Sequence, residues 1–265
     1  IPPFILNLIQ SRLQFGLLFL DLLAHRRDRH LIFADVLACP LDFVQQIIRD
    51  LTRIFEVSQP GDQDQVFPPG QYLVHRGELP IFEPGLDQLV ERNVRGGRLA
   101  FTTDLAQGVA DADAVFIAVG TPPKADGSAD LRYVEEVARS IAEHMNGPKL
   151  IITKSTVPIG TGKMIEKIIA DSGTSHKASV VSNPEFLREG SAIEDFMKPD
   201  RVVIGASDDE AAELMKEIYA PLHSLEIPFV VTNVESSELI KYAANGFLAT
   251  KITFINEIAQ VCERF

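Results

Sequence analysis

Short β-branched runs alternate with amphipathic helical stretches from about Arg76 onward, and this rhythm constrains the fold more than any other feature of the chain. Strands separated by helical segments are typical of a parallel sheet whose strands are joined by crossover helices. The strands are expected at residues 98–102, 114–119, 150–153, 178–181, 202–205 and 228–231. The predicted fold class is therefore α/β, with a doubly wound parallel sheet.

The stretches between the expected strands carry apolar residues at helical spacing. One stripe comprises Val134, Val137, Ala138, Ile141 and Met145, and a second comprises Ile165, Ile168 and Ile169. Asp130 and Thr161 are the expected N-caps of these helices. Residues 232–265 predict one long helix, opened by Thr232 with Glu235 as a capping box, that begins a second domain. Because this helix meets no stop signal and the chain does not begin with Met, we expect a fragment.

Charge and cysteine content narrow the possible function classes. The chain has 25 basic and 37 acidic residues, and its net charge of −12 argues against general binding to nucleic acid or to an anionic membrane surface. The most apolar early run, residues 17–20, is far shorter than the roughly 20 residues of a membrane span. Cys39 and Cys262 are too few for a disulfide framework and show no metal-ligand spacing. We therefore expect a cytoplasmic protein without a nucleic-acid partner, a membrane partner or a metal.

Residues 1–75 differ in composition from the rest of the chain. They contain six Arg, no Lys and a single Glu, Glu56, whereas all ten Lys come later. One interpretation is a divergent helical extension. The other is an aberrant segment outside the ancestral fold, such as a translation-frame error or a fusion.

The segment Asn183-Pro184-Glu185-Phe186-Leu187-Arg188-Glu189-Gly190 follows an expected strand. Ligands of open α/β sheets bind at this end of the strands. Asn183 is a good N-cap and Pro184 suits the first helical position, so a helix is expected to begin here. Glu185 and Glu189 are then one turn apart on the same face.

Three loops of similar chemistry leave the carboxyl ends of three expected strands. They are residues 120–123 (GTPP), 154–158 (KSTVP) and 182–185 (SNPE). Hydroxyls, backbone N–H groups and helix N-termini that gather at one sheet edge form a site for a phosphorylated ligand. The alternative is that each loop is ordinary turn chemistry.

Lys241 and Asn245 are spaced i, i+4 in the long helix and are expected to point the same way. A lysine beside an amide donor suits an oxygen that gains negative charge. The alternative is a solvated helix face. Gly246 in mid-helix suggests close approach by a ligand or another helix. Residues 77–86, with prolines and glycines, indicate a structural connector.

Together these segments resemble the UDP-glucose/GDP-mannose dehydrogenase family, and the UDP-glucose 6-dehydrogenase branch in particular. The resemblance runs over residues 76–263 and rests on motifs in the family's order and spacing. They are GELPIFEPGL, VGTPP, KSTVPIGTG, NPEFLREGSAI, PDRVVIG, SSELIKYAANGFLA and FINEIA. NPEFLREGSAI favours UDP-glucose over GDP-mannose or UDP-N-acetylmannosamine as the substrate.

The resemblance implies a Rossmann-like NAD-binding domain over residues 76–231 and the start of a central, dimerising domain over residues 232–265. It implies oxidation of UDP-glucose to UDP-glucuronate, in which two NAD act in succession: an aldehyde is made first, captured by a cysteine, oxidised to a thioester and hydrolysed. A homodimer through the long helix is also implied, and the helix carries more apolar residues than one packing layer requires. They are Leu248, Ile252, Phe254, Ile255 and Ile258.

The resemblance also assigns roles to individual residues. Thr121 and Thr156 would contact NAD, with Thr156 close to the chemistry, and Glu189 would lie where cofactor and substrate meet. Glu185 would act as general base or water activator in thioester hydrolysis, and the backbone of Phe186, Leu187 and Arg188 would line the sugar-nucleotide site. Lys241 and Asn245 would hold the oxygen on the sugar C6 carbon, where they would stabilise its developing charge.

Two departures from the family pattern stand out. Residues 1–75 contain no Gly-x-Gly-x-x-Gly fingerprint, since their glycines are Gly16, Gly61 and Gly70. Asp35 follows an apolar run, residues 31–34, but its likeness to the family's ribose-binding acid is interpreted as coincidence. Cys262 matches a non-catalytic cysteine, and the nucleophilic cysteine of the family belongs to a later motif. We therefore expect almost no alcohol oxidation and no thioester from the chain as written.

Two other functions remain open at this point. The first is a related sugar-nucleotide 6-dehydrogenase that acts on GDP-mannose or UDP-N-acetylmannosamine. The second is a non-catalytic α/β interaction module that binds no cofactor. The joint presence of Glu185, Glu189, Lys241 and Asn245 favours the dehydrogenase, because these four residues share no packing purpose.

Overall fold

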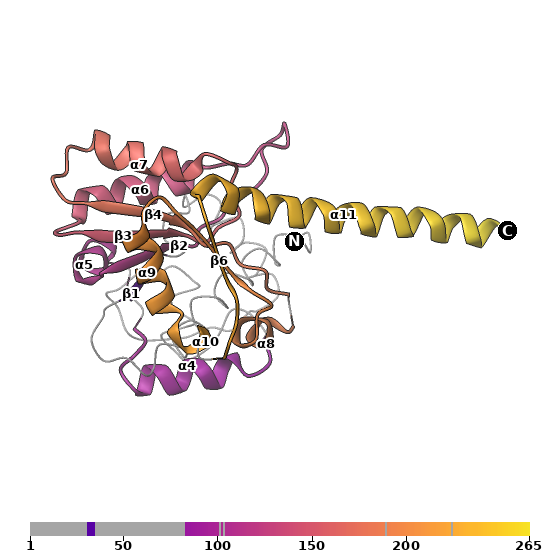
Figure 1. Cartoon of the computed structure of the whole chain (residues 1–265), viewed down its shortest axis with the longest axis horizontal. Helices are drawn as coiled ribbons and strands as arrows, with labels where there is room; N and C mark the ends of the chain where they lie inside the picture. The colour runs from indigo at the N-terminus through magenta and orange to yellow at the C-terminus, as the bar shows by residue number, and fades with distance from the viewer. Residues whose placement is uncertain (1–30, 35–82, 101, 103, 189, 224) are drawn as a thin grey trace, which may run out of the picture.

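A six-stranded sheet with helices on both faces forms the body of the protein (Figure 1). The computed structural model describes residues 31–34, 83–100, 102, 104–188, 190–223 and 225–265. The strands are β1 (Leu31–Ala34), β2 (Ala114–Ile117), β3 (Lys149–Thr153), β4 (Ala178–Ser182), β5 (Val202–Ala206) and β6 (Phe229–Thr232). Within the described residues, the order of the strands in the sheet is the order of the sequence.

The sheet changes direction once. Strands β1 to β4 are parallel to one another, β5 runs antiparallel to β4, and β6 is parallel to β5. The doubly wound α/β fold is confirmed, but the expected all-parallel sheet has an inverted pair of strands at one edge. Ser182 at the end of β4 pairs with Gly205 of β5, so the carboxyl ends of these two strands lie side by side.

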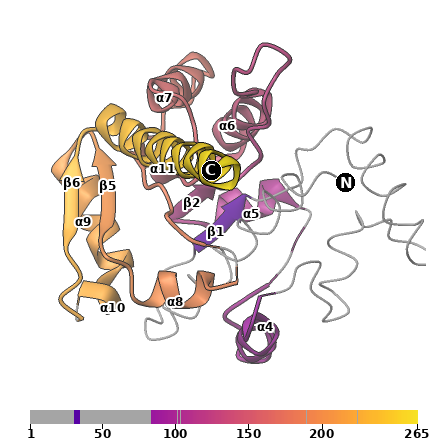
Figure 2. The same cartoon turned by 90° about the vertical axis from the view of Figure 1, so that its right-hand side faces the viewer.

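Two apolar cores cover the two faces of the sheet, because successive side chains of each strand point in opposite directions. Phe116, Ile152 and Ile204 face one core, whereas Ile117 and Ile151 face the other. Figure 2 shows α6 and α7 on one side of the sheet and α8 on the opposite side. The helices are α4 (Leu86–Arg95), α5 (Leu105–Asp111), α6 (Arg132–His144), α7 (Thr161–Asp171), α8 (Ala192–Met197), α9 (Asp209–Ile218), α10 (Ala220–His223) and α11 (Val234–Arg264).

The expected strand at residues 98–102 does not form at its described positions. Arg98 instead folds back on the end of α4, where its Nε donates to Asn93 Oδ1 at 2.9 Å. Its backbone N–H donates to the Asn93 carbonyl at 3.0 Å. These local bonds replace the ladder bonds of a strand. Residues 31–34, which were not among the expected strands, form β1 and pair with β2, whereas Asp35 lies outside the described residues.

Three helix starts differ from expectation by one residue. The N-cap of α7 is Gly160, with φ of 92°, and Thr161 is the first helical residue. The N-cap of α6 is Leu131, although Asp130 Oδ1 accepts from the N–H of Arg132. The N-cap of α11 is Asn233, whose side chain accepts from the N–H of Ser236 at 2.7 Å, because Thr232 is still part of β6.

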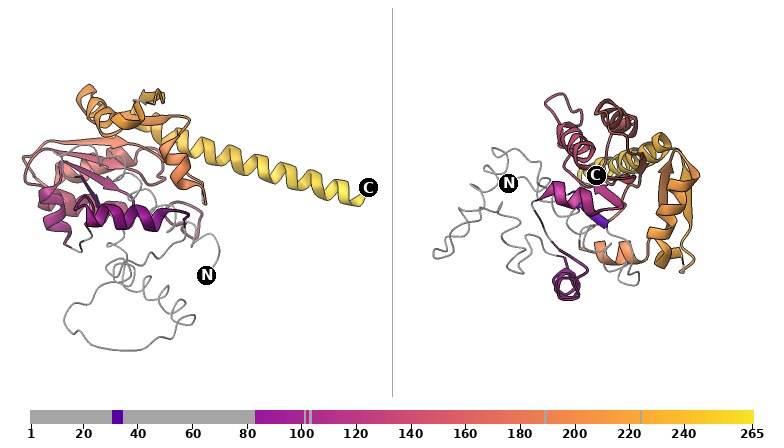
Figure 3. Two further views of the ribbon diagram at one scale, coloured as in Figure 1. Left: turned by 90° about the horizontal axis from the view of Figure 1, so that it is seen from below. Right: turned by 90° about the vertical axis from the view of Figure 1, so that its left-hand side faces the viewer.

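Helix α11 starts against the sheet and then runs away from the body (Figures 1 and 3). The contact needs a glycine in β5: a Cβ on Gly205 would lie 2.4 Å from Ser237 Cβ. Only one face of the first two turns is buried, and the residues of α11 on this face are Val234, Ser237, Glu238 and Lys241. No helix among the described residues has the length and apolarity of a membrane span.

Candidate active site

The loop between β4 and α8 carries the paired carboxylates predicted from the sequence, but it is not helical. Residues 183–188 form no helix, and α8 begins only at Ala192. The Glu185 carboxylate accepts a hydrogen bond from the N–H of Leu187 at 2.7 Å, which is a local turn. The expected helix at Asn183 is therefore wrong. Glu189 lies outside the described residues, so its position relative to Glu185 is not observed.

Asn183 makes tertiary contacts in place of the expected N-cap. Its backbone N–H donates to the Thr153 carbonyl at 2.9 Å, and its Nδ2 donates to the Val203 carbonyl at 2.7 Å. Its Oδ1 accepts from the hydroxyl of Tyr219 at 2.6 Å and from Nζ of Lys154 at 2.9 Å. The side chain thus joins β3, β5 and the end of α9 at the point where the sheet changes direction.

Lys154 is a buried residue that the sequence did not identify as functional. Its side chain is at the end of β3, it is 6% exposed, and its Nζ also donates to the Tyr219 hydroxyl at 3.2 Å. Burial holds the pKa of Lys154 well below its usual value, with the Glu185 carboxylate opposing this shift and the Lys241 ammonium adding to it. Burial also raises the pKa of Tyr219. The sequence signal that could have identified Lys154 is a lysine in a motif that directly follows a buried strand.

Lys241 of α11 reaches the same loop. Its Nζ donates to the backbone carbonyl of Glu185 and lies 3.3 Å from the Glu185 carboxylate, so the two residues form an ion pair. The Lys241 ammonium is also 5.1 Å from the centre of the Phe186 ring, and the Arg201 guanidinium lies 4.9 Å from that centre. Asn245 is one turn further along α11 and is exposed to solvent. The structure brings Lys241 and Glu185 together but leaves Asn245 without a contact to them.

The two loops after β2 and β3 are joined by their threonines. The Thr121 hydroxyl donates to the Thr156 carbonyl at 2.8 Å, and the Ser155 hydroxyl donates to the Val119 carbonyl at 2.6 Å. Thr121 and Thr156 are half-buried. Among the described residues, the hydroxyl of Thr156 makes no hydrogen bond. The expected meeting of loops at this edge of the sheet is therefore observed for the two loops that carry Thr121 and Thr156.

Glu238 connects α11 to the loop that carries Thr156. This residue is 2% exposed, and its carboxylate accepts from the backbone N–H groups of Gly160 at 2.7 Å and Gly162 at 2.8 Å. Burial raises the pKa of Glu238, while these two hydrogen bonds lower it. Because Glu238 is three residues before Lys241, the same helix face holds both groups.

Glu83 holds the other end of the loop between β4 and α8. Its carboxylate accepts from the backbone N–H groups of Gly190 at 2.9 Å and Ala192 at 2.8 Å. Arg188 pairs with Asp195 at 2.6 Å and donates its backbone N–H to the same carboxylate. The motif that includes Glu83 was interpreted as a connector, whereas the structure uses it to fix a loop 109 residues away.

The predicted substrate backbone is already engaged within the loop. The N–H of Leu187 bonds to Glu185, and the N–H of Arg188 bonds to Asp195. These two N–H groups are therefore already bonded within the protein and are not free to bind a sugar nucleotide. The Phe186 ring of the same segment is half-buried, and its centre lies 5.1 Å from the Lys241 ammonium and 4.9 Å from the Arg201 guanidinium.

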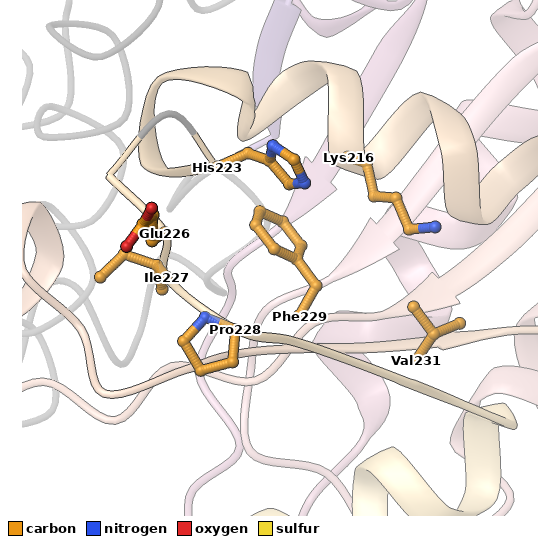
Figure 4. Close-up of a pocket in the computed structure, with 7 residues that line it drawn as sticks. All are labelled: Lys216, His223, Glu226, Ile227, Pro228, Phe229 and Val231. Carbon is orange, nitrogen blue, oxygen red and sulfur yellow. The ribbon is translucent and has the colours of Figure 1, made fainter.

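A separate surface pocket lies beside α9, α10 and β6 (Figure 4). Figure 4 shows the His223 and Phe229 rings facing each other, and their centres are 5.5 Å apart. None of the predicted site residues lines this pocket. In the part of the chain that the structure describes, no group of three His, Cys, Asp or Glu side chains is arranged to hold a metal ion.

Comparison with known proteins identifies two family models along the chain. The UDP-glucose/GDP-mannose dehydrogenase family, NAD binding domain, matches residues 72–223. The central domain of the same family matches residues 235–265.

Individual relatives agree with these matches. The UDP-glucose 6-dehydrogenase of Rhizobium meliloti (strain 1021) is 58% identical over 71% of this chain and 44% of its own length. A solved UDP-glucose dehydrogenase from the archaeon Pyrobaculum islandicum is 46% identical with a TM-score of 0.68, over 73% of this chain and 45% of that one. A GDP-mannose dehydrogenase ternary complex from Pseudomonas aeruginosa is 39% identical with a TM-score of 0.66, over 70% and 44%. The chain spans less than half the length of these relatives.

Proposed function

Since the chain belongs to the UDP-glucose/GDP-mannose dehydrogenase family, we propose that it supplies the NAD-binding part of an enzyme that oxidises UDP-glucose to UDP-glucuronate. The observation that carries this proposal is the contact of Lys241 with Glu185, which joins α11 to the loop after β4. A cation and a carboxylate are thereby held together at the edge of the sheet where open α/β proteins bind their ligands.

The described residues fit the nicotinamide end of NAD. The loops that follow β2 and β3 are joined by the bond from the Thr121 hydroxyl to the Thr156 carbonyl, and the Thr156 hydroxyl itself makes no hydrogen bond among the described residues. These two threonines would hold the cofactor, and Glu189 would lie where cofactor and substrate meet. When bound, NAD accepts a hydride from the alcohol carbon.

Lys241 and Asn245 would bind the oxygen on that carbon. Hydride loss is easier as this oxygen sheds its proton, and an ammonium near the developing charge stabilises the transition state by roughly 3 kcal/mol. Glu185 would act as general base or water activator in the later thioester hydrolysis, and its carboxylate lies 3.3 Å from the same ammonium. Phe186, Leu187 and Arg188 would line the sugar-nucleotide site, chiefly through side chains, since two of their N–H groups are engaged.

The proposed domain organisation follows from the same reasoning. Residues 76–231 would form the NAD-binding domain, 232–265 would begin the central domain, and 1–75 would be an aberrant segment. The family matches at residues 72–223 and 235–265 support the first two assignments.

We also propose a homodimer through α11 in the cytoplasm. The part of α11 beyond its second turn exposes many apolar side chains, and such a band is typical of a surface that associates. They are Phe247, Leu248, Ile252, Phe254, Ile255, Ile258 and Val261. The location is supported by the two cysteines, since Cys39 and Cys262 fit a reducing compartment.

UDP-glucose is favoured over the other sugar nucleotides by the relatives. Identity to the archaeal UDP-glucose dehydrogenase is 46%, against 39% to the GDP-mannose dehydrogenase. A non-catalytic module is disfavoured because it has no use for a buried Lys241 that donates to Glu185.

The test is a chimera in which residues 76–265 replace the matching segment of the Rhizobium meliloti enzyme. Formation of NADH is measured with UDP-glucose, GDP-mannose and UDP-N-acetylmannosamine. We expect turnover with UDP-glucose, loss of turnover in Lys241→Ala, and little change in the control Lys251→Ala, an exposed lysine of the same helix. A folded chimera that prefers another sugar nucleotide, or that forms no NADH, contradicts the proposal.

A further inference from the structure

The sheet reverses direction between β4 and β5, and three buried polar side chains meet at this reversal. They are Lys154, Asn183 and Tyr219, and all three are less than 10% exposed. We infer that these residues form a positioning network that fixes Glu185 against Lys241. This inference rests on the proposed function, because it concerns the same pair of groups.

The hydrogen bonds of Asn183 are the first part of the argument. Oδ1 accepts two bonds, from Lys154 and Tyr219, and Nδ2 donates one to the Val203 carbonyl. The backbone N–H donates to Thr153. Asn183 is 1% exposed, so water does not replace these partners and each lost bond leaves a buried polar group unpaired. The position of Asn183 is therefore determined by β3, β5 and α9 together.

The short distance along the chain from Asn183 to Glu185 is the second part. Only Pro184 separates them, its φ angle is fixed by its ring, and it is buried. A shift of Asn183 is therefore passed to the Glu185 carbonyl, which is the acceptor of the Lys241 ammonium. The carboxylate follows, since Glu185 also bonds to Leu187 within the same turn.

The choice of lysine at position 154 is the third part. A buried ammonium is costly, and an apolar side chain of similar volume is often neutral or stabilising for the fold. Stability alone thus gives no reason for Lys154, whereas one Nζ that bonds to both Asn183 and Tyr219 orients each of them. The network is built from groups 29 and 65 residues apart from Lys154, so it exists only in the folded state.

Tyr219→Phe tests the network, because it removes a single oxygen atom that bonds to both other members. The matched control is Tyr133→Phe, a second buried tyrosine that packs in the core on the opposite face of the sheet. The measurement on the 265-residue chain is the rate at which Lys241 is reductively methylated, followed by mass spectrometry of its peptide. Lys241 is 8% exposed, so this rate reports how often it leaves Glu185.

We expect the methylation rate of Lys241 to rise roughly fivefold in Tyr219→Phe, which is the effect of one hydrogen bond on an open–closed equilibrium. Lys154→Met should give a similar rise, and Tyr133→Phe should give none even where it lowers stability. An unchanged Lys241 rate in Tyr219→Phe, or an equal rise in Tyr133→Phe, overturns the network. NADH formation by the parent chimera distinguishes the two proposals. If Lys241 is methylated faster in Tyr219→Phe but the parent chimera forms no NADH, the network is supported and the proposed function is rejected.

Discussion

The Glu238 carboxylate accepts the backbone N–H of Gly162 at 2.8 Å, so a side chain of α11 occupies the N-terminus of α7. Helix α7 has no side-chain cap of its own, because its N-cap is glycine. The free N–H groups and the positive end of the helix dipole favour an anionic partner at this point. The contact fixes α11, and with it Lys241, relative to the loop that carries Thr156.

Replacement of Glu238 by Ala should lower the free energy of unfolding by roughly 1.5–3 kcal/mol, since two N–H groups lose a charged acceptor. The measurement is urea unfolding together with amide exchange at Gly160 and Gly162. Glu235→Ala is the control, because Glu235 pairs with Lys163 on the exposed surface, where such pairs contribute about 0–1 kcal/mol. Equal losses in both variants would contradict the capping role.

Gly205→Ala should destabilise the protein by roughly 1–3 kcal/mol through overpacking. The added Cβ would lie 2.4 Å from Ser237 Cβ and 2.9 Å from the Asn233 carbonyl oxygen, and backbone cannot move aside as a flexible side chain can. Thermal unfolding measures the effect. Gly147→Ala is the control, since a Cβ there meets no atom within 4 Å. Full stability of Gly205→Ala would show that α11 does not pack on β5 as described.

The stability contributed by Lys154 should depend on pH. Its folded pKa is lowered from the usual 10.5 by burial, so between the two values the unfolded state binds more protons and stability rises with pH. The groups that face its amine are Glu185, Lys241 and Tyr219, and burial raises the pKa of Tyr219 so that it stays neutral in this window.

We therefore expect the free energy of unfolding of the wild type to rise relative to Lys154→Met as the pH increases toward 10.5, the usual pKa of lysine. Urea unfolding at several pH values provides the comparison. Lys251→Met, at an exposed position of α11, controls for the loss of one positive charge. A difference between wild type and Lys154→Met that does not vary with pH would rule out the depressed pKa.

Glu83→Gln should loosen the loop between β4 and α8. The amide of glutamine cannot accept both N–H groups, so amide exchange at Gly190 and Ala192 should rise by roughly tenfold, and binding of UDP-glucose by the chimera should weaken. Asp87→Asn is the control, an exposed carboxylate in the first turn of α4. Unchanged exchange at both amides would mean that Glu83 does not hold the loop.

Ile255→Asp should weaken the proposed homodimer. Ile255 is 58% exposed on α11, and a carboxylate buried in an apolar interface without a partner costs several kcal/mol. Sedimentation velocity measures the dimer fraction. Thr253→Asp introduces the same charge two residues away, outside the apolar band, and should leave association unchanged. A monomer in the wild type at all concentrations would reject the homodimer.

Residue periodicity was sufficient to predict β2 to β6 within two residues at each end. It failed at residues 98–102, because hydrogen bonds between Arg98 and Asn93 outweigh the β-propensity of that run. It also could not show the inverted direction of β5, which depends on the loop and on packing rather than on the strand residues themselves.

The site was predictable where motif residues meet directly, as Glu185 and Lys241 do. The supporting residues Lys154, Glu238 and Glu83 were missed because no sequence pattern points to their partners, which are the Asn183 side chain and the backbone N–H groups of Gly162 and Ala192. Glu238 has one sequence signal: it shares a helix face with Val234 and Ser237, where an apolar contact is expected and a charge needs a partner.

Helix α11 is about 45 Å long, whereas Lys241 lies only about 10 Å from its first residue. If the helix pivots where it rests on Gly205, a tilt of about 3° displaces the far end by about 2 Å and Lys241 by about 0.5 Å. Lys241 is thus mechanically insulated from strain at the far end of the helix, and the two subunits of the proposed homodimer would adjust to each other without displacing it.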